Sequence, residues 1–208
     1  MRRAKRHQRA FLRVFGGLWL SLASTVAFAQ QADTYAYGVH GRLTSVHQGV
    51  APSESVTTYD LDAAGNRTRV TKAPIFLESW NAAALPHGAG FAEEGDWAAN
   101  IHTPHAHIIY GPYVPAPTGA RVAIFQILID AANPLDASAV GVIDVNDAST
   151  MEVLASRTLS RSDFVADWTY QYFELPFTIP LERSGHPIEY RVYFHANSHI
   201  RIRQVGYR

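Results

Sequence analysis

Cysteine is missing from all 208 residues of the sequence. This absence excludes a disulfide framework, a thiol nucleophile and a thiolate metal site. A folded core must therefore be held together by hydrophobic packing, and 47% of the residues are hydrophobic. The length suits one ordinary domain and a short additional segment.

An excess of positive charge is missing too, because 18 basic residues are balanced by 18 acidic ones. The basic residues gather at the start of the chain, where the first acid is Asp33. Six lie within the first thirteen residues, namely Arg2, Arg3, Lys5, Arg6, Arg9 and Arg13. The apolar stretch 14–26 follows, and then Ala27-Phe28-Ala29. This order predicts a cleavable secretory signal peptide over residues 1–29.

A membrane anchor is the alternative interpretation of the N-terminal segment. The apolar run is shorter than the roughly 20 residues of a spanning helix, so we expect cleavage and no stable membrane insertion. Cleavage would leave 18 − 6 = 12 basic residues against 18 acidic ones. A net charge of 12 − 18 = −6 provides no excess of positive charge that would attract nucleic acid or anionic lipid. We expect a secreted or periplasmic protein whose partner is a glycan or another cell-envelope component.

Residues 30–72 are polar, rich in Thr, Gly and Ser, and carry an internal repeat with an offset of 24 residues. The matching pairs are Tyr35 and Tyr59, Gly41 and Gly65, Thr44 and Thr68, and Val46 and Val70. Each copy predicts a β-hairpin with glycine at the turn position that needs a positive φ angle.

This repeat resembles the YD repeat of the RHS family. The second copy runs Tyr59-Asp60 to Gly65-Asn66-Arg67-Thr68, whereas the first has Ala36 in place of the aspartate. Proteins of that family wind many repeats into a hollow β-shell, but repeat arrays need about three or more units to bury a continuous core. We therefore expect this segment to be a remnant of a repeat array, a flexible stalk or an edge hairpin. The resemblance also suggests an RHS-type protein as an alternative partner, through protein–protein contacts.

Residues 73–208 contain apolar runs of strand length separated by turn-forming clusters. The runs are Ile75–Trp80, His107–Tyr110, Arg121–Asp130, Val140–Val145, Glu152–Leu159, Tyr170–Ile179, Ile188–His195 and Ile200–Tyr207. Several alternate between apolar and polar residues, and none has a helical period. The pattern predicts an all-β fold, an antiparallel β-sandwich (jelly roll) of about eight strands.

The order of features in this part resembles the galactose-binding-like jelly rolls of carbohydrate-binding modules. Leu77-Glu78-Ser79 opens a strand, a Gly-rich loop leads to Trp97, and Tyr110-Gly111-Pro112-Tyr113 precedes a long apolar strand. The resemblance implies a non-catalytic module that binds carbohydrate. Fold alone does not fix function.

Sugar binding needs flat aromatic faces beside groups that hydrogen-bond to hydroxyls. Within a predicted loop, Trp97 is the first candidate, with Asp96 and Asn100 as polar contacts. Trp168 is the second candidate, and Tyr113 could line a groove. The alternative is that the two tryptophans seal the ends of the core.

Metal ligands are a weaker expectation, and no other cofactor is predicted. His105 and His107 would project from the same face of a strand, and His102 could complete a set of three. The resemblance implies a structural calcium near Glu78, but a matching acid near the chain end is missing. We interpret the oxygens of residues 144–147 as turn caps.

Signatures of catalysis are absent from the sequence, which has no nucleophile elbow and no phosphate loop. Acidic residues are plentiful, but a glycosidase needs two carboxylates at a set separation, which sequence does not show. We therefore predict that the protein is not an enzyme. Hydrolase activity through its acidic loops is the remaining alternative.

Overall fold

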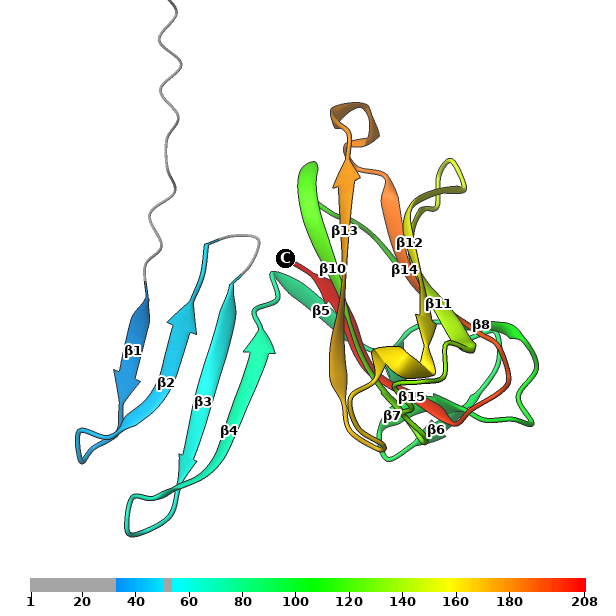
Figure 1. The fold of residues 1–208 in the computed structure, drawn as a ribbon. Helices are drawn as coiled ribbons and strands as arrows, with labels where there is room; N and C mark the ends of the chain where they lie inside the picture. The colour runs from blue at the N-terminus through cyan, green and yellow to red at the C-terminus, as the bar shows by residue number, and fades with distance from the viewer. Residues whose placement is uncertain (1–32, 51–53) are drawn as a thin grey trace, which may run out of the picture.

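The computed structural model describes residues 33–50 and 54–208, so the predicted signal peptide lies outside the described residues. The described chain is built from β-strands and three single-turn 3-10 helices (Figure 1). These short helices are η1 (Ala82–Ala84), η2 (Arg161–Asp163) and η3 (Leu181–Arg183). The predicted all-β class is confirmed. In the part of the chain that the structure describes, no helix is both long and apolar enough to span a membrane.

The repeat segment forms a four-stranded antiparallel sheet, here called sheet A. Its strands, in spatial and chain order, are β1 (Thr34–Tyr37), β2 (Leu43–Gln48), β3 (Ser55–Leu61) and β4 (Arg67–Pro74). Each predicted repeat is one hairpin, with Gly41 at φ 67° and Gly65 at φ 87° in the turns. The repeats join where β2 pairs with β3, for example Ser45 opposite Thr58.

Sheet A is a single layer beside the rest of the molecule (Figure 1). Among its described residues, Val46 is the only buried hydrophobic side chain, with 5% of its surface exposed. Tyr35 and Tyr37 on β1 are exposed. The sheet therefore depends on its hydrogen-bonded ladders more than on a core.

Residues 78–207 form two further sheets that pack face to face as the predicted sandwich. Sheet B has the strand order β13 (Gln171–Ile179), β10 (Gly119–Ile129), β15 (Ile200–Tyr207), β7 (Asp96–Ala99) and β6 (Phe91–Glu93), and β5 (Glu78–Asn81) also pairs with β15. Sheet C has the order β12 (Glu152–Ser160), β11 (Ala139–Asp147), β14 (Pro187–Phe194) and β8 (Ala106–Ile109), and β9 (Pro112–Pro115) also pairs with β14.

The core lies between these two sheets because apolar residues alternate along the strands. On β14, Tyr190, Val192 and Phe194 are at most 1% exposed and belong to the core. Phe125 of β10 is fully buried opposite Phe173 of β13. Full burial of side chains of this size stabilises the fold by about 1.5–3 kcal/mol each.

The sandwich contains three short strands that the sequence analysis did not predict, namely β6, β7 and β9. Strands β6 and β7 form a hairpin that turns at Glu94 and Gly95, both with positive φ. The expected loop position of Trp97 is therefore wrong, since it lies on β7. Strands of three or four residues are too short to show a period-two pattern.

The two parts of the molecule meet where the chain passes from β4 to β5. The Leu77 amide donates to the Tyr207 carbonyl at 2.9 Å, and Arg208 Nη1 donates to the Glu54 carbonyl at 2.9 Å. The ring of Phe76 lies 6.5 Å from that of Tyr172 on β13. Sheet A is thus attached to the sandwich near the ends of β13 and β15.

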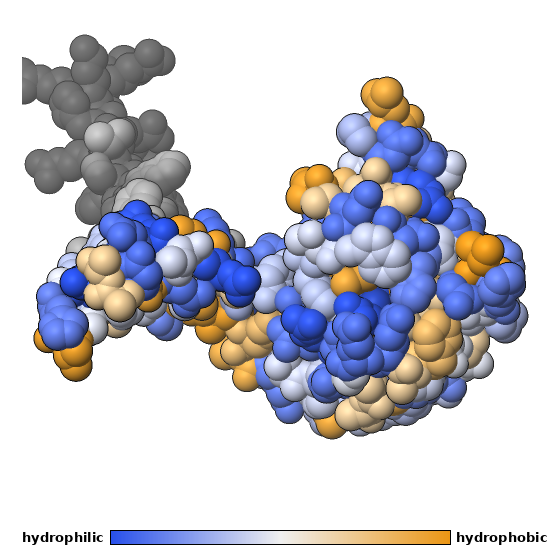
Figure 2. All heavy atoms as spheres, turned by 90° about the horizontal axis from the view of Figure 1, so that it is seen from below, coloured by the Kyte–Doolittle hydropathy of each residue, from blue (hydrophilic) through white to orange (hydrophobic). Residues whose placement is uncertain are grey.

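The surface of the sandwich is mixed in character. On the face seen in Figure 2, apolar residues form separate patches among polar ones. Its exposed apolar side chains include Leu135, Val165 and Leu181. Exposed apolar side chains are normal on a folded domain.

Candidate functional site

Asp96 and Trp97 are consecutive residues on β7 and therefore point to opposite faces of sheet B. Trp97 faces the core side, where it packs against the hydrophobic cluster and lies opposite Ile202. Its Nε1 donates to the Ala89 carbonyl at 2.9 Å. Its ring stacks on His87 at 3.4 Å between centroids and an interplanar angle of 10°. One face of the indole and its N–H group are therefore already occupied.

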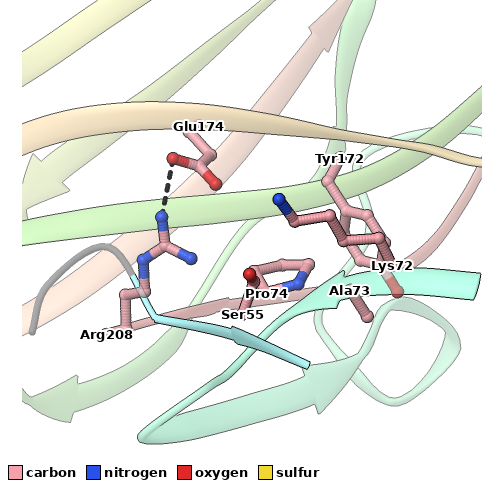
Figure 3. A pocket seen from close by; sticks show the side chains of 7 residues that line it. All are labelled: Ser55, Lys72, Ala73, Pro74, Tyr172, Glu174 and Arg208. Atoms are coloured by element: carbon pink, nitrogen blue, oxygen red, sulfur yellow. Dashed lines mark hydrogen bonds and ion pairs between the residues drawn. The ribbon is translucent and has the colours of Figure 1, made fainter. Parts of the chain in front are cut away.

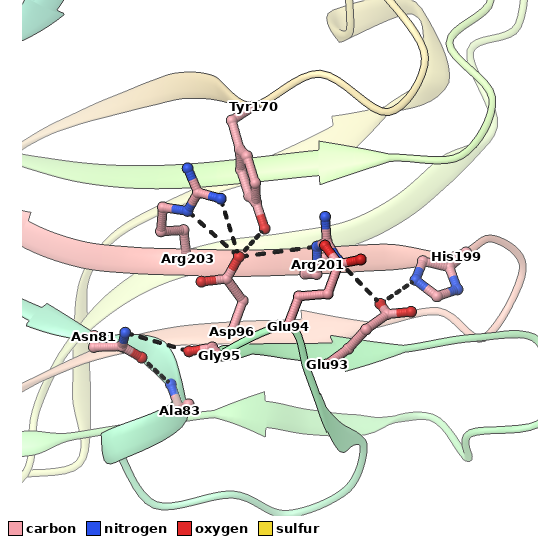
Figure 4. Close-up of polar contacts among 10 residues, drawn as sticks. All are labelled: Asn81, Ala83, Glu93, Glu94, Gly95, Asp96, Tyr170, His199, Arg201 and Arg203. Carbon is pink, nitrogen blue, oxygen red and sulfur yellow. Dashed lines mark hydrogen bonds and ion pairs between the residues drawn. The ribbon is translucent and has the colours of Figure 1, made fainter.

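Asp96 lies on the outer face of sheet B and is only 4% exposed. Its carboxylate accepts a hydrogen bond from the Tyr170 hydroxyl and lies 3.4 Å from Arg203 Nε (Figure 4). The Arg203 guanidinium in turn sits 4.0 Å above the Tyr170 ring. Burial, together with the bond to Asp96, raises the pKa of Tyr170, so this hydroxyl stays protonated.

This cluster continues along the outer face of sheet B to Trp168. His199 Nε2 is 2.9 Å from the Glu93 carboxylate, and Arg201 Nη1 donates to Glu94 at 2.7 Å (Figure 4). The Trp168 ring is 57% exposed and lies 5.1 Å from the His199 ring. We call the following set the sheet B surface: Asp96, Trp168, Tyr170, His199, Arg201 and Arg203. The fold thus brings Asp96 and Trp168 to one surface and leaves Trp97 on the other side of the sheet.

Asn100 follows β7 and organises a tight turn. Its Oδ1 accepts from the His102 amide at 2.9 Å, and its carbonyl accepts from the Thr103 amide at 2.8 Å. Its own amide donates to Thr103 Oγ1 at 3.1 Å. An asparagine in this arrangement shapes the backbone, and its side-chain oxygen is already engaged.

A second surface is the outer face of sheet C, which the alternation of β14 creates. Because Tyr190, Val192 and Phe194 point into the core, the residues between them point outward. We call this the β14 face and define it by its outward residues on β8, β11 and β14 and one residue after β14: His107, Asp144, Asn146, Glu189, Arg191, Tyr193 and His195.

Charged groups on the β14 face form a closely connected row. Arg191 Nε donates to Asp144 Oδ1 at 2.6 Å, and Arg191 Nη1 lies 3.6 Å from Glu189. Asn146 Nδ2 donates to Glu189 Oε2 at 2.6 Å. Asp144 and Glu189 are only 6% and 5% exposed, and their contacts with Arg191 hold both carboxylates in place. The Oδ1 of Asn146 is buried and has no hydrogen-bond partner among the described residues.

Aromatic rings adjoin this row on the same face. Tyr193 lies edge-on between His107 at 5.2 Å and His195 at 5.7 Å. His105 continues the group, 6.3 Å from His195. Burial lowers the pKa of His107, and the nearby Arg191 lowers it further, so this ring is neutral at neutral pH.

Tyr113, a predicted ligand contact, lies at the other end of this row on β9. Its ring is 45% exposed, and its hydroxyl is hydrogen-bonded to Glu189. Burial and that bond raise the pKa of Tyr113 to about 12. Tyr113 has a positive φ of 66°, a conformation that is uncommon for a residue other than glycine.

The metal candidates are dispersed. Across residues 33–50 and 54–208, no group of three His, Asp or Glu side chains is placed to hold a metal ion. His107 Nε2 lies 3.9 Å from Asp144, and Glu78 on β5 accepts from the Tyr207 hydroxyl at 3.1 Å. His102 is in the turn that follows β7.

The interpretation of residues 144–147 as turn caps is correct for only one of the three oxygen-bearing side chains. Asp144 and Asn146 are part of β11, where they pair with β14. Asp147 does cap the turn, because its Oδ1 accepts from the amides of Ser149 and Thr150.

Several residues of the β14 face were missed as site candidates. Glu189, Arg191, Tyr193 and His195 occupy every second position, and this alternation was visible in the sequence. It identified the outward side of a strand, but it did not show that β11 would place Asp144 and Asn146 beside them. That proximity depends on a pairing between segments more than 40 positions apart.

Comparison with known proteins agrees with the predicted repeat. Residues 39–73 match the family model described as RHS Repeat, which confirms the resemblance over that segment. No curated protein matches the chain significantly.

Solved structures resemble the fold only distantly. The ligand-free carbohydrate-binding module BiXyn10A CBM1 aligns with a TM-score of 0.39 and 12% identity, over 64% of this chain and 96% of that one. An apo cyclase from Fischerella sp. aligns at 0.33 and 10% identity, over 89% and 91%. An arabinose-bound α-L-arabinofuranosidase, MgGH51, aligns at 0.32 and 10% identity, over 82% of this chain and 24% of that one. Likeness at this level says nothing of ligand or activity.

Proposed function

We propose that this protein is an exported, non-catalytic module that binds carbohydrate on the β14 face. The observation that carries the proposal is the meeting of an aromatic group and a row of fixed charges on one outward sheet face. Tyr193 lies between two histidine rings, next to the Arg191–Asp144 pair. Aromatic rings can stack on the C–H face of a sugar, and charged groups hydrogen-bond strongly to hydroxyls.

Positioning on β-strands favours this face as a binding surface. Asp144, Glu189 and Arg191 are held by one another and by the ladder between β11 and β14. Groups held in place lose little conformational entropy when a ligand binds.

Calorimetric titration of the protein with a panel of soluble polysaccharides tests this proposal. The Tyr193→Ala variant should bind the polysaccharide that the parent protein binds about tenfold more weakly, a loss of about 1.4 kcal/mol in binding free energy. The matched variant Trp168→Ala alters the sheet B surface and should bind like the parent. If no polysaccharide binds, or if Tyr193→Ala binds normally, the proposal is wrong.

The sheet B surface is the alternative location for the same ligand class. It combines the exposed Trp168 ring with the buried Asp96 carboxylate, which the sequence analysis had placed beside Trp97. Trp97 and Asn100 are less suited, because the Trp97 N–H group and the Asn100 Oδ1 already have partners. A loss of binding in Trp168→Ala together with normal binding in Tyr193→Ala would favour this location.

Export is the second part of the proposal, supported by the N-terminal charge and hydropathy pattern. Mass spectrometry of protein recovered outside the cytoplasm should give a chain that begins at Gln30. An intact chain that begins at Met1 and stays in the cell extract would contradict export.

Contact with an RHS-type protein is a second candidate function, favoured by the family match over residues 39–73. Tagged protein isolated from its native source should then carry an RHS-type protein, identified by mass spectrometry. Isolation of a monomer alone, from cells in which such a protein is detected, would count against this function.

A further inference from the structure

A pocket of about 300 Å³ lies where sheet A meets the edge of the sandwich (Figure 3). Its walls come from β3, β4, β13 and the residue after β15. The polar side chains that line it are Ser55, Lys72, Tyr172, Glu174 and Arg208. Because β13 and β15 belong to sheet B, the pocket is separate from the β14 face of sheet C.

The pocket carries two cations against one carboxylate. Arg208 Nη2 pairs with Glu174 Oε2 at 2.8 Å, so these two charges compensate each other. Lys72 forms no ion pair within 4.0 Å with any described residue. Figure 3 shows its ammonium group projecting into the pocket on the side of Glu174. One positive charge is therefore available for a ligand.

The other walls supply a flat ring and fixed donors. Tyr172 is held against Phe76, and burial raises the pKa of its hydroxyl, which keeps it protonated. Arg208 is 8% exposed and is also fixed by the Glu54 carbonyl. Its Nε is buried without a partner in the described structure, which is rare for a buried donor.

We propose that this pocket binds a single uronic acid unit. The carboxylate of the sugar would pair with Lys72, and its ring would lie against Tyr172, with Ser55 hydrogen-bonded to a hydroxyl. A volume near 300 Å³ is at the lower end of small-molecule pockets and suits one sugar ring. This site is independent of carbohydrate binding at the β14 face.

The lysine content of the chain gives a direct probe of the pocket. Lys72 and Lys5 are the only lysines in the sequence. Reductive ¹³C-methylation preserves the positive charge and gives each lysine its own NMR signal, and the Lys72→Arg variant identifies that of Lys72. Glucuronate should shift the Lys72 signal saturably. Glucose at the same concentrations should not.

Calorimetry with glucuronate then measures the role of the charge. Lys72→Gln should bind at least tenfold more weakly, whereas Lys72→Arg should keep most of the affinity. Arg69→Gln is the matched control, because it removes one positive charge from an exposed position of the same strand. Glucuronate should bind this variant as it binds the parent protein.

Three results would overturn the proposal. The first is equal binding of glucose and glucuronate, and the second is unchanged binding by Lys72→Gln. The third is a saturable shift of the Lys72 signal by acetate at the same affinity, which would show that any carboxylate suffices. None of these results depends on polysaccharide binding at the β14 face, which Tyr193→Ala tests separately.

Discussion

Gly90 and Gly95 lie on either side of the β6 strand, and both have a positive φ angle, 99° and 85°. Their surroundings differ. A Cβ atom on Gly90 would lie 2.4 Å from the Ala98 carbonyl oxygen and 2.7 Å from Trp97 Nε1, whereas nothing lies within 4 Å of one on Gly95. The hairpin therefore needs Gly90 for space and for conformation, and Gly95 for conformation alone.

This difference predicts unequal costs of substitution at the two glycines. Gly90→Ala should lower the free energy of unfolding by about 3 kcal/mol, because the cost of backbone strain and the cost of overpacking add together. Gly95→Ala should lower it by only about 1 kcal/mol, the cost of the left-handed conformation. Urea unfolding of both variants measures this. Equal losses would show that Trp97 and the Ala98 carbonyl do not confine Gly90.

Asp147 is a buried carboxylate with several donors around it. Burial opposes its ionisation, but hydrogen bonds from His186 and the amides of Ser149 and Thr150 outweigh that effect and lower its pKa below 3.8. A lowered folded-state pKa stabilises the fold above pH 3.8, and this contribution disappears as the pH falls through the folded value. The folded state should thus lose stability below about pH 4.

Asp147→Asn tests this contribution. The variant should be less stable than the parent at pH 7, and its stability should fall less between pH 5 and pH 3. Urea midpoints at several pH values show both effects. Parallel curves for the two proteins would mean that Asp147 has the same pKa in the folded and unfolded states.

At the residue scale, the type of residue in the site was easier to predict than its position. Asp96, Trp97 and Asn100 were expected to act together, but a strand sends the first two to opposite faces. Tyr113 and His107 were chosen for different reasons, a groove and a metal, and the fold places Tyr113 against Glu189 and His107 beside Tyr193 and Asp144 of the same face. Proximity of this kind depends on strand pairing, which one sequence does not specify.

At the element scale, the long strands were predictable and the short ones only in part, since β5 and β8 of four residues lie in predicted apolar runs whereas β6, β7 and β9 do not. The runs that became β10, β13, β14 and β15 have eight or more residues, enough to show their apolar or alternating pattern. Strands β6, β7 and β9 have three or four residues. Pairing with the longer strands β15 and β14 sets the places of β7 and β9, and the hairpin with β7 sets that of β6. The turn glycines of sheet A were predictable because Gly41 and Gly65 recur within a repeat.

Sheet A should be the less protected element of the molecule. It has one buried hydrophobic side chain among its described residues, so local opening needs little free energy. Hydrogen exchange should be at least tenfold faster in peptides from residues 33–50 and 54–74 than in β10, as expected for a local opening free energy lower by about 1.4 kcal/mol or more. Mass spectrometry of the exchanged peptides measures this. Equal protection in both parts would contradict the prediction.

At the scale of the whole molecule, few contacts connect sheet A to the sandwich. They include the bond from Arg208 to the Glu54 carbonyl and the contact between Phe76 and Tyr172. The pocket that contains Lys72 lies at this junction. Movement of sheet A relative to the sandwich would change the shape of that pocket without altering the β14 face.

Weak coupling also predicts that the two parts respond separately to mutation. The tryptophans of residues 33–208, Trp80, Trp97 and Trp168, all lie in the sandwich, so fluorescence reports its unfolding alone. Phe125→Ala leaves a cavity in the core and should lower the free energy of unfolding by about 3–5 kcal/mol. Val46→Ala in sheet A should leave the fluorescence midpoint unchanged while hydrogen exchange in sheet A accelerates. A midpoint that falls in Val46→Ala would show that sheet A and the sandwich unfold as one cooperative unit, and that the junction contributes more stability than its few contacts indicate.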